Sequence, residues 1–496
     1  MNDIILHKQR YKLFAYEKKM AVKEVQSILH PEYIREENDC IKAYGCKRIE
    51  NASRLVFYSS YENEGTETTT TQAIRESSTR KKQNTRYYAH GIHDYKGKFN
   101  PQIVKALLNI FDIQPGQRVL DPFCGSGTSL FEIQLMGGVP YGVDINPMAV
   151  FIASTKTSVG NEVEACVNFN IDAFMTSVQD CRVDISGKTE RMVYLRSWFR
   201  EDYLRCLEAI RITAGNEKNE SLRKLILLCA SNIIREYSEQ EPSDLRIRRR
   251  KSAYPEESLF HRFSAEFTAI QVKIAKMLED NVGNVPKATI YNDSVVNIGG
   301  YKEYKNYFDF AVTSPPYATA LPYIDTQRLS LVWLGLARPS EIIMLESSLI
   351  GSRELKRKSV AAELLTDLKT NANKISSASH YICMDLQNKL VPSDGFRKQN
   401  VPILLYRYIS EMRAMFSSVY TVLKTGAYYC LVVGHNKTTI GGVTTYIDTP
   451  TLLCNEAAEQ GFVVSEVLPL ETYQRYGIHA QNAITNESLI VLQKQE

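Results

Sequence analysis

A glycine-rich turn between an apolar strand and a helical pattern constrains the fold of this chain more than any other segment. Residues 119–128 read Val-Leu-Asp-Pro-Phe-Cys-Gly-Ser-Gly-Thr. Gly125 and Gly127 lack Cβ, so the main chain can bend sharply there and a ligand can approach it closely, while Thr128 can cap the following helix. Many tight turns share this pattern, but it is also typical of a strand–turn–helix unit that binds a nucleotide.

Two later segments support the nucleotide-binding interpretation. A second short apolar strand ends at Asp144, roughly twenty residues after the turn, where nucleotide-binding folds place the carboxylate that holds a ribose diol. Residues 308–317 read Phe-Asp-Phe-Ala-Val-Thr-Ser-Pro-Pro-Tyr, a strand of the buried type that ends in two prolines and a tyrosine. Strands alternate with helical patterns around these segments, which predicts a doubly wound α/β sheet with ligands at the carboxyl ends of its strands.

The two motifs together resemble those of the S-adenosylmethionine-dependent DNA amino-methyltransferases, which make N4-methylcytosine or N6-methyladenine. The resemblance rests on residues 121–128 and 313–317 and extends from about Tyr87 to the C-terminus. It implies a Rossmann-like sheet, S-adenosyl-L-methionine as cofactor and double-stranded DNA as partner. The cofactor-binding residues expected from the motifs and from the resemblance are Lys98, Phe99, Asp121, Pro122, Phe123, Gly125, Gly127, Thr128, Asp144 and Asp293.

The predicted catalytic residues are Ser314, Pro315, Pro316 and Tyr317. The exocyclic amine of a base is a poor nucleophile, so the enzyme has to position and polarise it. The Ser314 hydroxyl and a backbone carbonyl, that of Pro315, can accept hydrogen bonds from the amine, and the two prolines stiffen the turn. Tyr317 offers a flat face to a base swung out of the helix. This chemistry needs no thiolate, and Cys124 is interpreted as a small packing residue.

Serine before Pro-Pro-Tyr resembles the N4-cytosine group, and N6-adenine is the alternative base. Two other functions stay open at this stage. One is an RNA base amino-methyltransferase, since related turns modify RNA. The other is a non-catalytic protein that retains the cofactor fold.

The chain divides into four predicted regions. Residues 1–85 form an N-terminal region of unknown role that ends in a polar linker, over about 62–85. Residues 86–150 carry the cofactor motifs, and residues 151–285 form a long, mainly helical insert that is expected to recognise the DNA target. Residues 286–496 complete the methyltransferase domain and include an insertion, 325–402, that could share in recognition.

The densest cationic run lies in the first insert. A run of like charges is stabilised by an anion, so phosphate contact is a reasonable hypothesis, and a solvated charged face is the alternative. The overall net charge of +4 permits a polyanionic partner without requiring one. The predicted DNA-binding residues are Arg246, Arg248, Arg249, Arg250 and Lys251.

Composition limits the remaining possibilities. No apolar run reaches the roughly 18 residues that a membrane span needs, and the amino terminus lacks the apolar core of a secretory signal. We therefore expect a cytoplasmic protein, associated with the nucleoid in a bacterium, an archaeon or a phage-infected cell. The 10 cysteines lack paired metal-type spacing, so no metal site is expected. No nuclease motif is evident, and any cleavage would come from a separate restriction or defence protein.

Overall fold

A seven-stranded mixed sheet forms the centre of the molecule, in the order β13-β14-β10-β9-β6-β7-β8. The computed structural model describes residues 3–9, 11–37, 40–77, 82–244, 247–318, 323–355, 358–471 and 486–495. The strands of this sheet are β6 (Arg118–Asp121), β7 (Val139–Val143), β8 (Thr289–Tyr291), β9 (Phe308–Thr313), β10 (Leu423–Gly434), β13 (Phe462–Glu471) and β14 (Asn486–Lys494).

The directions of the strands indicate at which edge of the sheet a ligand can bind. β10, β9, β6, β7 and β8 are parallel neighbours, whereas β14 runs antiparallel to both β10 and β13. The chain runs outward from β6 to β7 and β8 and then returns to β9 on the other side of β6. Such a switch point opens a crevice at the carboxyl ends of the strands. The prediction of a doubly wound, Rossmann-like sheet is confirmed.

Helices cover both faces of the sheet, and β9 contributes side chains to two separate cores. Phe310 and Val312 point into a core shared with α3 (Pro101–Ile110) and α1 (Ala15–Leu29). Phe308 and Ala311 belong to the opposite core, with α17 (Val401–Val422) and α18 (Thr449–Ala458). Apolar residues on both faces are typical of a strand buried between two helical layers.

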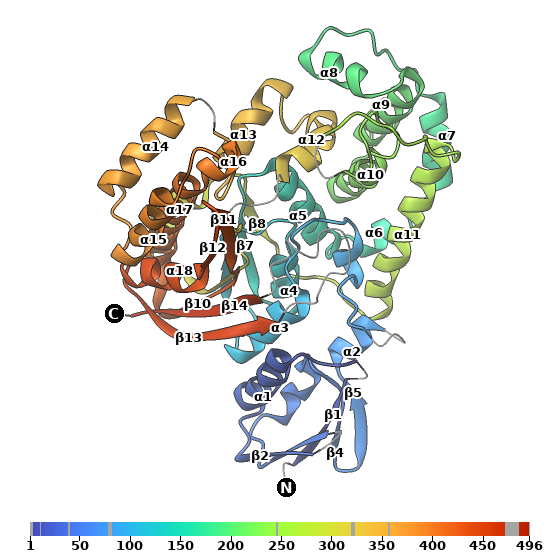
Figure 1. Ribbon diagram of the computed structural model, residues 1–496. Helices are drawn as coiled ribbons and strands as arrows, with labels where there is room; N and C mark the ends of the chain where they lie inside the picture. The colour runs from blue at the N-terminus through green and yellow to red at the C-terminus, as the bar shows by residue number, and fades with distance from the viewer. Residues whose placement is uncertain are drawn as a thin grey trace.

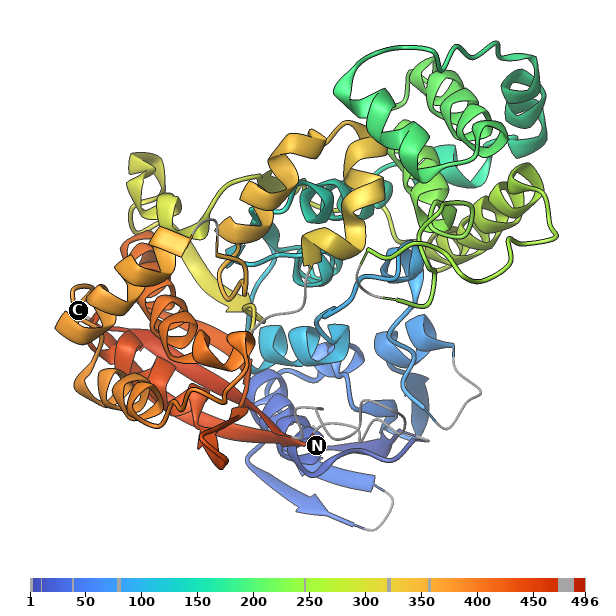
Figure 2. The same ribbon diagram turned by 45° about the horizontal axis from the view of Figure 1, so that its top comes forward.

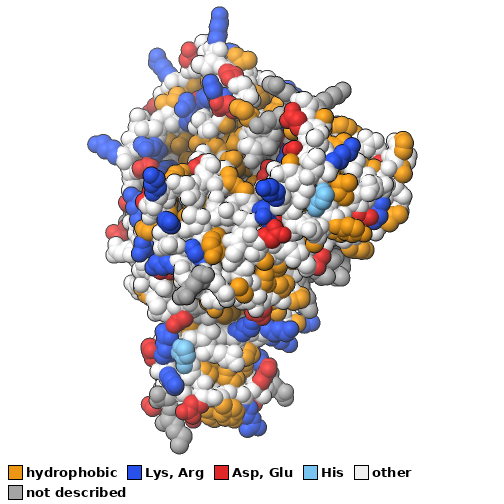
Figure 3. All heavy atoms as spheres, turned by 90° about the vertical axis from the view of Figure 1, so that its left-hand side faces the viewer, with side chains coloured by type: hydrophobic (Ala, Val, Ile, Leu, Met, Phe, Trp, Pro, Cys, Tyr) orange, Lys and Arg blue, Asp and Glu red, His pale blue; other side chains and the backbone are white. Residues whose placement is uncertain are grey.

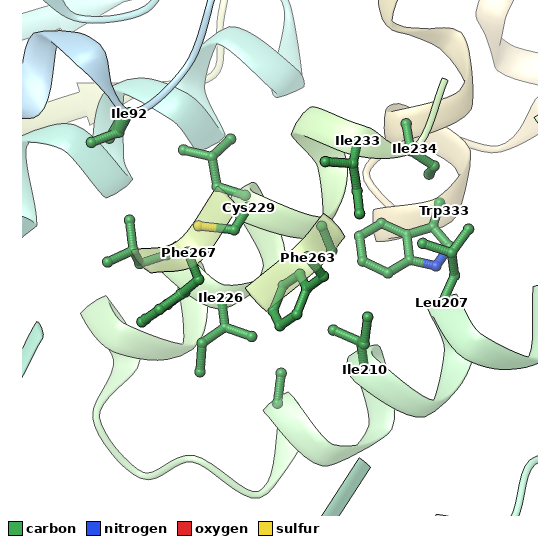
Figure 4. Packing of buried hydrophobic residues seen from close by; sticks show 14 of the residues in the cluster. Ile92, Leu207, Ile210, Ile226, Cys229, Ile233, Ile234, Phe263, Phe267 and Trp333 are labelled. Carbon is green, nitrogen blue, oxygen red and sulfur yellow. The ribbon is translucent and has the colours of Figure 1, made fainter. Parts of the chain in front are cut away.

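The long insert between β7 and β8 is helical, as predicted. After α4 (Thr128–Leu135) and α5 (Pro147–Val159), it contains α6 (Val163–Val167), α7 (Ile171–Asp180), α8 (Glu190–Trp198), α9 (Glu201–Gly215), α10 (Glu220–Ile233) and α11 (Leu259–Glu279). Figure 4 shows Phe263 and Phe267 among aliphatic side chains of the neighbouring helices. Trp333 of α12 (Tyr323–Leu334) enters the same core, so the insert packs against the segment that follows the catalytic motif.

The second insertion is also helical. Beyond α12 it contains α13 (Ile342–Ser348), α14 (Lys358–Thr370), α15 (Ser377–Asn388) and the short α16 (Phe396–Gln399). A two-stranded hairpin, β11 (Asn436–Ile440) and β12 (Val443–Ile447), follows β10 and was not anticipated from the sequence. Figures 1 and 2 show the N-terminal region at one end of the molecule and the helices of the first insert at another.

The N-terminal region is a separate antiparallel sheet, in the order β2-β3-β1-β4-β5. Its elements are β1 (Ile4–Lys8), β2 (Tyr33–Glu36), β3 (Cys40–Tyr44), β4 (Tyr58–Asn63), β5 (Thr66–Thr69) and α2 (Thr71–Glu76). The predicted polar linker is therefore wrong over much of 62–85. The threonines form the exposed edge strand β5, a position that suits β-branched polar residues, and the Thr70 hydroxyl accepts a hydrogen bond from Ala73 N at the start of α2.

The 10 cysteines are free thiols, seven of them buried. In the ranges that the structure describes, no cluster of three His, Cys, Asp or Glu side chains could hold a metal ion. Among the same residues, no helix is long and apolar enough to cross a membrane.

A buried carboxylate connects the N-terminal region to the central domain. Glu24 of α1 is fully buried, and both of its oxygens accept a hydrogen bond from Val56 N at 3.1 Å. Its Oε1 also accepts a hydrogen bond from Asn109 Nδ2 of α3. Burial raises the pKa of Glu24 to about 7, while these hydrogen bonds oppose the shift. The two units therefore share a polar contact that water does not reach.

We expect Glu24→Ala to lower the free energy of unfolding by about 2–3 kcal/mol, because it leaves the Val56 amide without an acceptor and removes one of the two acceptors of Asn109 Nδ2. Urea unfolding followed by circular dichroism measures this change. Glu50→Ala, at an exposed position of the same region, is the control and should shift the free energy by less than about 0.5 kcal/mol. Equal values for both variants would contradict the buried contact.

Candidate active site

A cleft lies where the carboxyl ends of β6, β7, β8 and β9 meet. Seven of the residues predicted from the sequence line it: Pro122, Phe123, Gly125, Asp144, Asp293, Ser314 and Pro316. The predicted cofactor turn and catalytic turn, almost 200 residues apart in the sequence, thus share one cavity.

The glycine turn adopts a backbone that only glycine accepts readily. Gly125 and Gly127 have φ values of 50° and 73°, in the left-handed region. A Cβ on Gly127 would lie 2.9 Å from the Cβ of Ala153, so α5 leaves no room for a side chain there. Thr128 does not cap α4 as expected. It is the first residue of the helix, buried, and Gly127 takes the N-cap position.

Asp144 is held by the main chain of the turn. Its Oδ2 accepts a hydrogen bond from Gly125 N at 2.9 Å, and its Oδ1 accepts one from Asn146 N at 2.8 Å. Burial raises the pKa of Asp144 to about 6, although the two hydrogen bonds favour the charged form. The carboxylate is therefore ionised at neutral pH and titrates just below it.

Asp121 does not line the cleft but connects its two halves. Its Oδ1 accepts hydrogen bonds from the Thr313 hydroxyl at 2.6 Å and from Phe123 N at 3.0 Å, and its Oδ2 accepts one from the Ser129 hydroxyl. Burial raises the pKa of this carboxyl to about 6. Asp121 thereby ties β9 to the start of the glycine turn, so it is a positioning residue and not the direct cofactor contact expected.

Asp293 follows β8 on another wall of the cleft. Tyr301 donates to its Oδ2 at 2.6 Å, and Asn297 donates to its Oδ1 at 2.7 Å. Burial acts to raise its pKa, but these hydrogen bonds and one from Ser294 N bring the pKa below its usual value. Asp293 is therefore a fixed negative charge at the edge of the cavity.

The catalytic turn leaves β9 toward the cleft. Ser314 is half-buried, and its hydroxyl donates to the carbonyl of Val432 at 3.4 Å, a long bond that a substrate could replace. Pro315 is buried below it. The hydroxyl of Tyr317 donates to Glu487 Oε1 of β14 at 2.6 Å, and Tyr317 does not line the cleft. Its ring is thus held toward the β14 side of the turn.

Two tyrosines that sequence analysis did not select form an aromatic wall. The rings of Tyr95 and Tyr323 are nearly parallel, at 11°, with centroids 6.3 Å apart, and both line the cleft. Gly97 lies beside them with φ of 74°, and a Cβ there would be 3.0 Å from the Tyr323 hydroxyl. Gly97, two residues after Tyr95, is the sequence feature that could have indicated this wall. A side chain at that position would be too close to the Tyr323 ring.

The expectation that Lys98 and Phe99 face the cofactor is corrected. Lys98 Nζ donates to the carbonyls of Thr85 at 2.7 Å and His90 at 3.0 Å, and burial lowers its pKa to about 8. Phe99 packs against the core beneath α3. Both side chains point away from the cleft. Lys98 binds backbone carbonyls, and Phe99 packs among apolar residues.

Two arginines of the cationic run bind groups within the first insert. The Arg250 guanidinium donates to the carbonyls of Ser238 and Glu236, both at 2.7 Å, and also to those of Arg235 and Ala253. Arg249 lies over the Trp198 ring, 4.1 Å from its centroid. Arg250 is therefore corrected from a DNA contact to a structural residue, because the chain uses its donors.

The remaining cations of the run are more accessible. Arg248 is exposed and pairs with Asp244 at 3.1 Å, and Lys251 is exposed. Arg246 lies outside the described residues. The run also touches the catalytic side of the molecule, since Ile247 N donates to Asp325 Oδ2 of α12 at 3.0 Å. Figure 3 shows Lys and Arg side chains spread among acidic ones on another face, without one continuous basic stripe.

Comparison with known proteins agrees with this geometry. A family model described as an RMKL-like methyltransferase domain matches residues 90–191. The Type II methyltransferase M.MvaI of Kocuria varians is 27% identical over 291 residues, which cover 54% of this chain and 63% of that protein. The Type II methyltransferase M.AvaI of Anabaena variabilis is 22% identical over 429 residues, covering 79% of this chain and 83% of the relative.

A shorter match involves a different substrate. The tRNA (guanine(10)-N2)-dimethyltransferase of Methanothermobacter thermautotrophicus is 40% identical over 52 residues, 10% of this chain and 16% of the relative. The chain spans less than two thirds of the length of M.MvaI. The sheet and the family model agree with a methyltransferase fold of the kind that binds S-adenosylmethionine. Within that class, the chain is similar to Type II methyltransferases over 54–79% of its length.

The lining of the cleft has groups suited to S-adenosyl-L-methionine. It combines the open backbone of the glycine turn, two carboxylates that can accept hydrogen bonds from hydroxyl or amino groups, and an aromatic wall. Asp144 accepts a hydrogen bond from Gly125 N of the glycine turn, and Asp293 follows the next strand, β8. S-adenosyl-L-methionine is the cofactor, and these residues are the ones suited to hold it.

The pKa of Asp144 predicts the pH dependence of cofactor binding. Since the ionised carboxylate is the better acceptor for hydroxyl groups, affinity should be constant above pH 7 and fall by up to about tenfold per pH unit below about 6. Isothermal titration calorimetry from pH 8 to pH 5 measures this. Asp144→Asn should bind more weakly at pH 8 and lose most of the pH dependence. A variant that keeps the wild-type profile would show that another group titrates.

Proposed function

We propose that the chain is a site-specific DNA methyltransferase that transfers a methyl group to the exocyclic amine of a base, with N4 of cytosine as the preferred position. The observation that carries this proposal is the placement of Ser314 and Pro316 in the same cleft as Asp144 and the glycine turn. The names of the relatives M.MvaI and M.AvaI, both Type II methyltransferases, support a DNA substrate.

The residues of the cleft divide the work between binding and polarisation. S-adenosylmethionine, when bound, supplies a methyl group on a sulfonium centre that is already electrophilic. Asp144 holds the ribose hydroxyls, and Asp293 is available to an amino group at the other end of the nucleoside. The Ser314 hydroxyl, with the carbonyl of Pro315, accepts hydrogen bonds from the amine of the base and favours a nitrogen lone pair directed at the methyl group.

The turn has to be stiff for this to work. Pro315 and Pro316 fix φ and lack amide donors, so the carbonyls of the turn stay free to accept hydrogen bonds. The sequence predicts that Tyr317 stacks on a base that has left the helix, but Tyr317 does not line the cleft, so we propose that it instead braces the turn against β14. Its hydroxyl is held by Glu487, which fixes the plane of the ring relative to the turn.

Serine at position 314 favours cytosine, and adenine N6 is the alternative base for the same geometry. An RNA substrate is a second candidate function, favoured by the short match to the tRNA (guanine(10)-N2)-dimethyltransferase. A separate restriction or defence protein is the partner we propose for a methyltransferase of this group. A non-catalytic cofactor-binding protein would not need the Ser-Pro-Pro turn in the cleft.

Base analysis tests the proposal. The protein is expressed in a host that lacks DNA methylation, and its DNA is hydrolysed to nucleosides and analysed by mass spectrometry. We expect N4-methylcytosine with the wild-type protein and at least about a hundredfold less with Ser314→Ala, the size of effect seen when one aligned polar group is removed from an active site. Ser186→Ala, at an exposed site of the insert, is the matched control.

The outcomes separate the alternatives. N6-methyladenine would keep the mechanism and change the base. Methylated nucleosides in RNA alone would replace DNA as the substrate. Full activity of Ser314→Ala would contradict the role of the hydroxyl, and absence of any methylated base with a soluble, cofactor-binding protein would contradict the proposal.

A further inference from the structure

An exposed aromatic residue and two cations lie together outside the cleft. Phe396 is 77% exposed in α16, and Arg397 and Lys398 follow it, both exposed. Val443 at the turn of the β11–β12 hairpin is 51% exposed, and Val391 just before α16 is 39% exposed. We call these five residues the α16 surface. Large apolar side chains gathered at the surface of a soluble domain commonly mark a binding site.

The α16 surface is built on a fixed scaffold. Asp394 Oδ2 accepts hydrogen bonds from Val391 N at 3.1 Å and from Gly441 N of the hairpin at 3.0 Å. A Cβ on Gly441 would lie 2.4 Å from the carbonyl of Lys389, so the hairpin approaches this loop as closely as glycine permits. The side chain of Gln399 donates to the carbonyl of Asp394 at 2.9 Å. These hydrogen bonds hold the loop that precedes α16, where Phe396 is exposed.

The charge of this surface is positive. Among the residues that the structure describes, no ion pair involves Arg397 or Lys398. The carboxylate of Asp394 accepts hydrogen bonds from two scaffold amides, and these bonds together with the charge of Lys398 lower its pKa, so Asp394 offsets part of the positive charge and Arg397 keeps its own. Lysine is depleted at the core of protein–protein interfaces, whereas an aromatic residue beside exposed cations suits a stacked base and its phosphates.

The position of the α16 surface relates it to the cleft. The hairpin continues from the carboxyl end of β10, and the carbonyl of Val432 in β10 accepts the hydrogen bond from Ser314. Figure 1 shows α16 and the hairpin on the same side of the sheet as α13, and Leu349 and Ile350, just after α13, line the cleft. DNA that presents a base to Ser314 would therefore extend toward this surface.

We propose that the α16 surface is a second DNA contact, in which Phe396 wedges against the bases beside the extruded nucleotide while Arg397 and Lys398 bind the flanking phosphates. The inference rests on the proposed function and adds its contact residues. A base that leaves the stack opens a gap, and an apolar wedge offsets part of the unstacking, which costs a few kcal/mol per step. The first insert would then contact the same DNA from the other side of the cleft.

Two variants test the two halves of the proposal. For Arg397→Gln/Lys398→Gln, the slope of log K against log salt for duplex DNA should flatten by about 1.8, since two phosphate contacts are lost. For Phe396→Ala, kcat for methylation of unmethylated phage DNA should fall at least about tenfold, while cofactor affinity stays at the wild-type value. Fluorescence anisotropy and transfer of labelled methyl groups measure these effects.

Matched controls come from the same chain. Lys18→Gln/Lys19→Gln removes an adjacent pair of exposed cations on α1, and Tyr381→Ala removes an aromatic ring that is 69% exposed on α15. Both should behave as the wild-type protein does. Wild-type slopes and kcat in the α16 variants, or equal effects in the controls, would overturn the inference.

The test also separates this inference from the function on which it rests. A wild-type protein that neither binds nor methylates DNA would remove the proposed function itself. A wild-type protein that methylates DNA, with unchanged α16 variants, would remove only the inference. If Phe396→Ala instead converts a dimer into a monomer without changing the salt slope, the surface joins two copies of the chain and the inference is wrong.

Discussion

The hydrogen bonds of the buried Asp121 carboxylate are the interaction on which the site depends. One carboxylate receives the Thr313 hydroxyl from the catalytic strand, and Phe123 N and the Ser129 hydroxyl from the glycine turn and its helix. Asp144 continues the connection from Gly125 to the next strand. Because these bonds are out of water, breaking them leaves donors unsatisfied. The cofactor side and the base side of the cleft are therefore fixed relative to each other.

Around this centre, the additions to the sheet are joined to it by buried polar groups as well as by apolar packing. Glu24 fastens the N-terminal sheet to α3, and Arg191 of the insert bonds to the carbonyl of Trp333 in α12 and to the buried Glu208. Such contacts fix orientation, because each buried charge is satisfied in one geometry only. The two insertions thereby flank the cleft, the first through the hydrogen bond of Ile247 N to Asp325 and the second through residues 348–350.

Local sequence motifs predicted the residues at the centre of the candidate site. The positions of the other residues depend on contacts with distant parts of the chain. The glycine turn, Asp144 and Ser314 could be found in the sequence because each lies at the end of an apolar strand, and parallel strands bring their ends together. Lys98 and Phe99 could not be placed, since their partners are the carbonyl of Thr85 and the core beneath α3. The charge of the cationic run was evident, but nothing local indicated that Arg250 would bind four carbonyl groups. Tyr323 lies far in sequence from Tyr95, which it stacks against.

The most direct test of the account is to measure cofactor affinity and methyl-transfer rate together in Asp121→Ala and Asp121→Asn, with circular dichroism as a check on folding. The account predicts that the alanine variant loses both properties, because the turn and the catalytic strand are no longer tied, and that the asparagine variant, whose side-chain oxygen can still accept from Thr313 and Phe123, loses less of each. An alanine variant that folds and keeps wild-type cofactor affinity and methyl transfer would contradict the central role of this carboxylate.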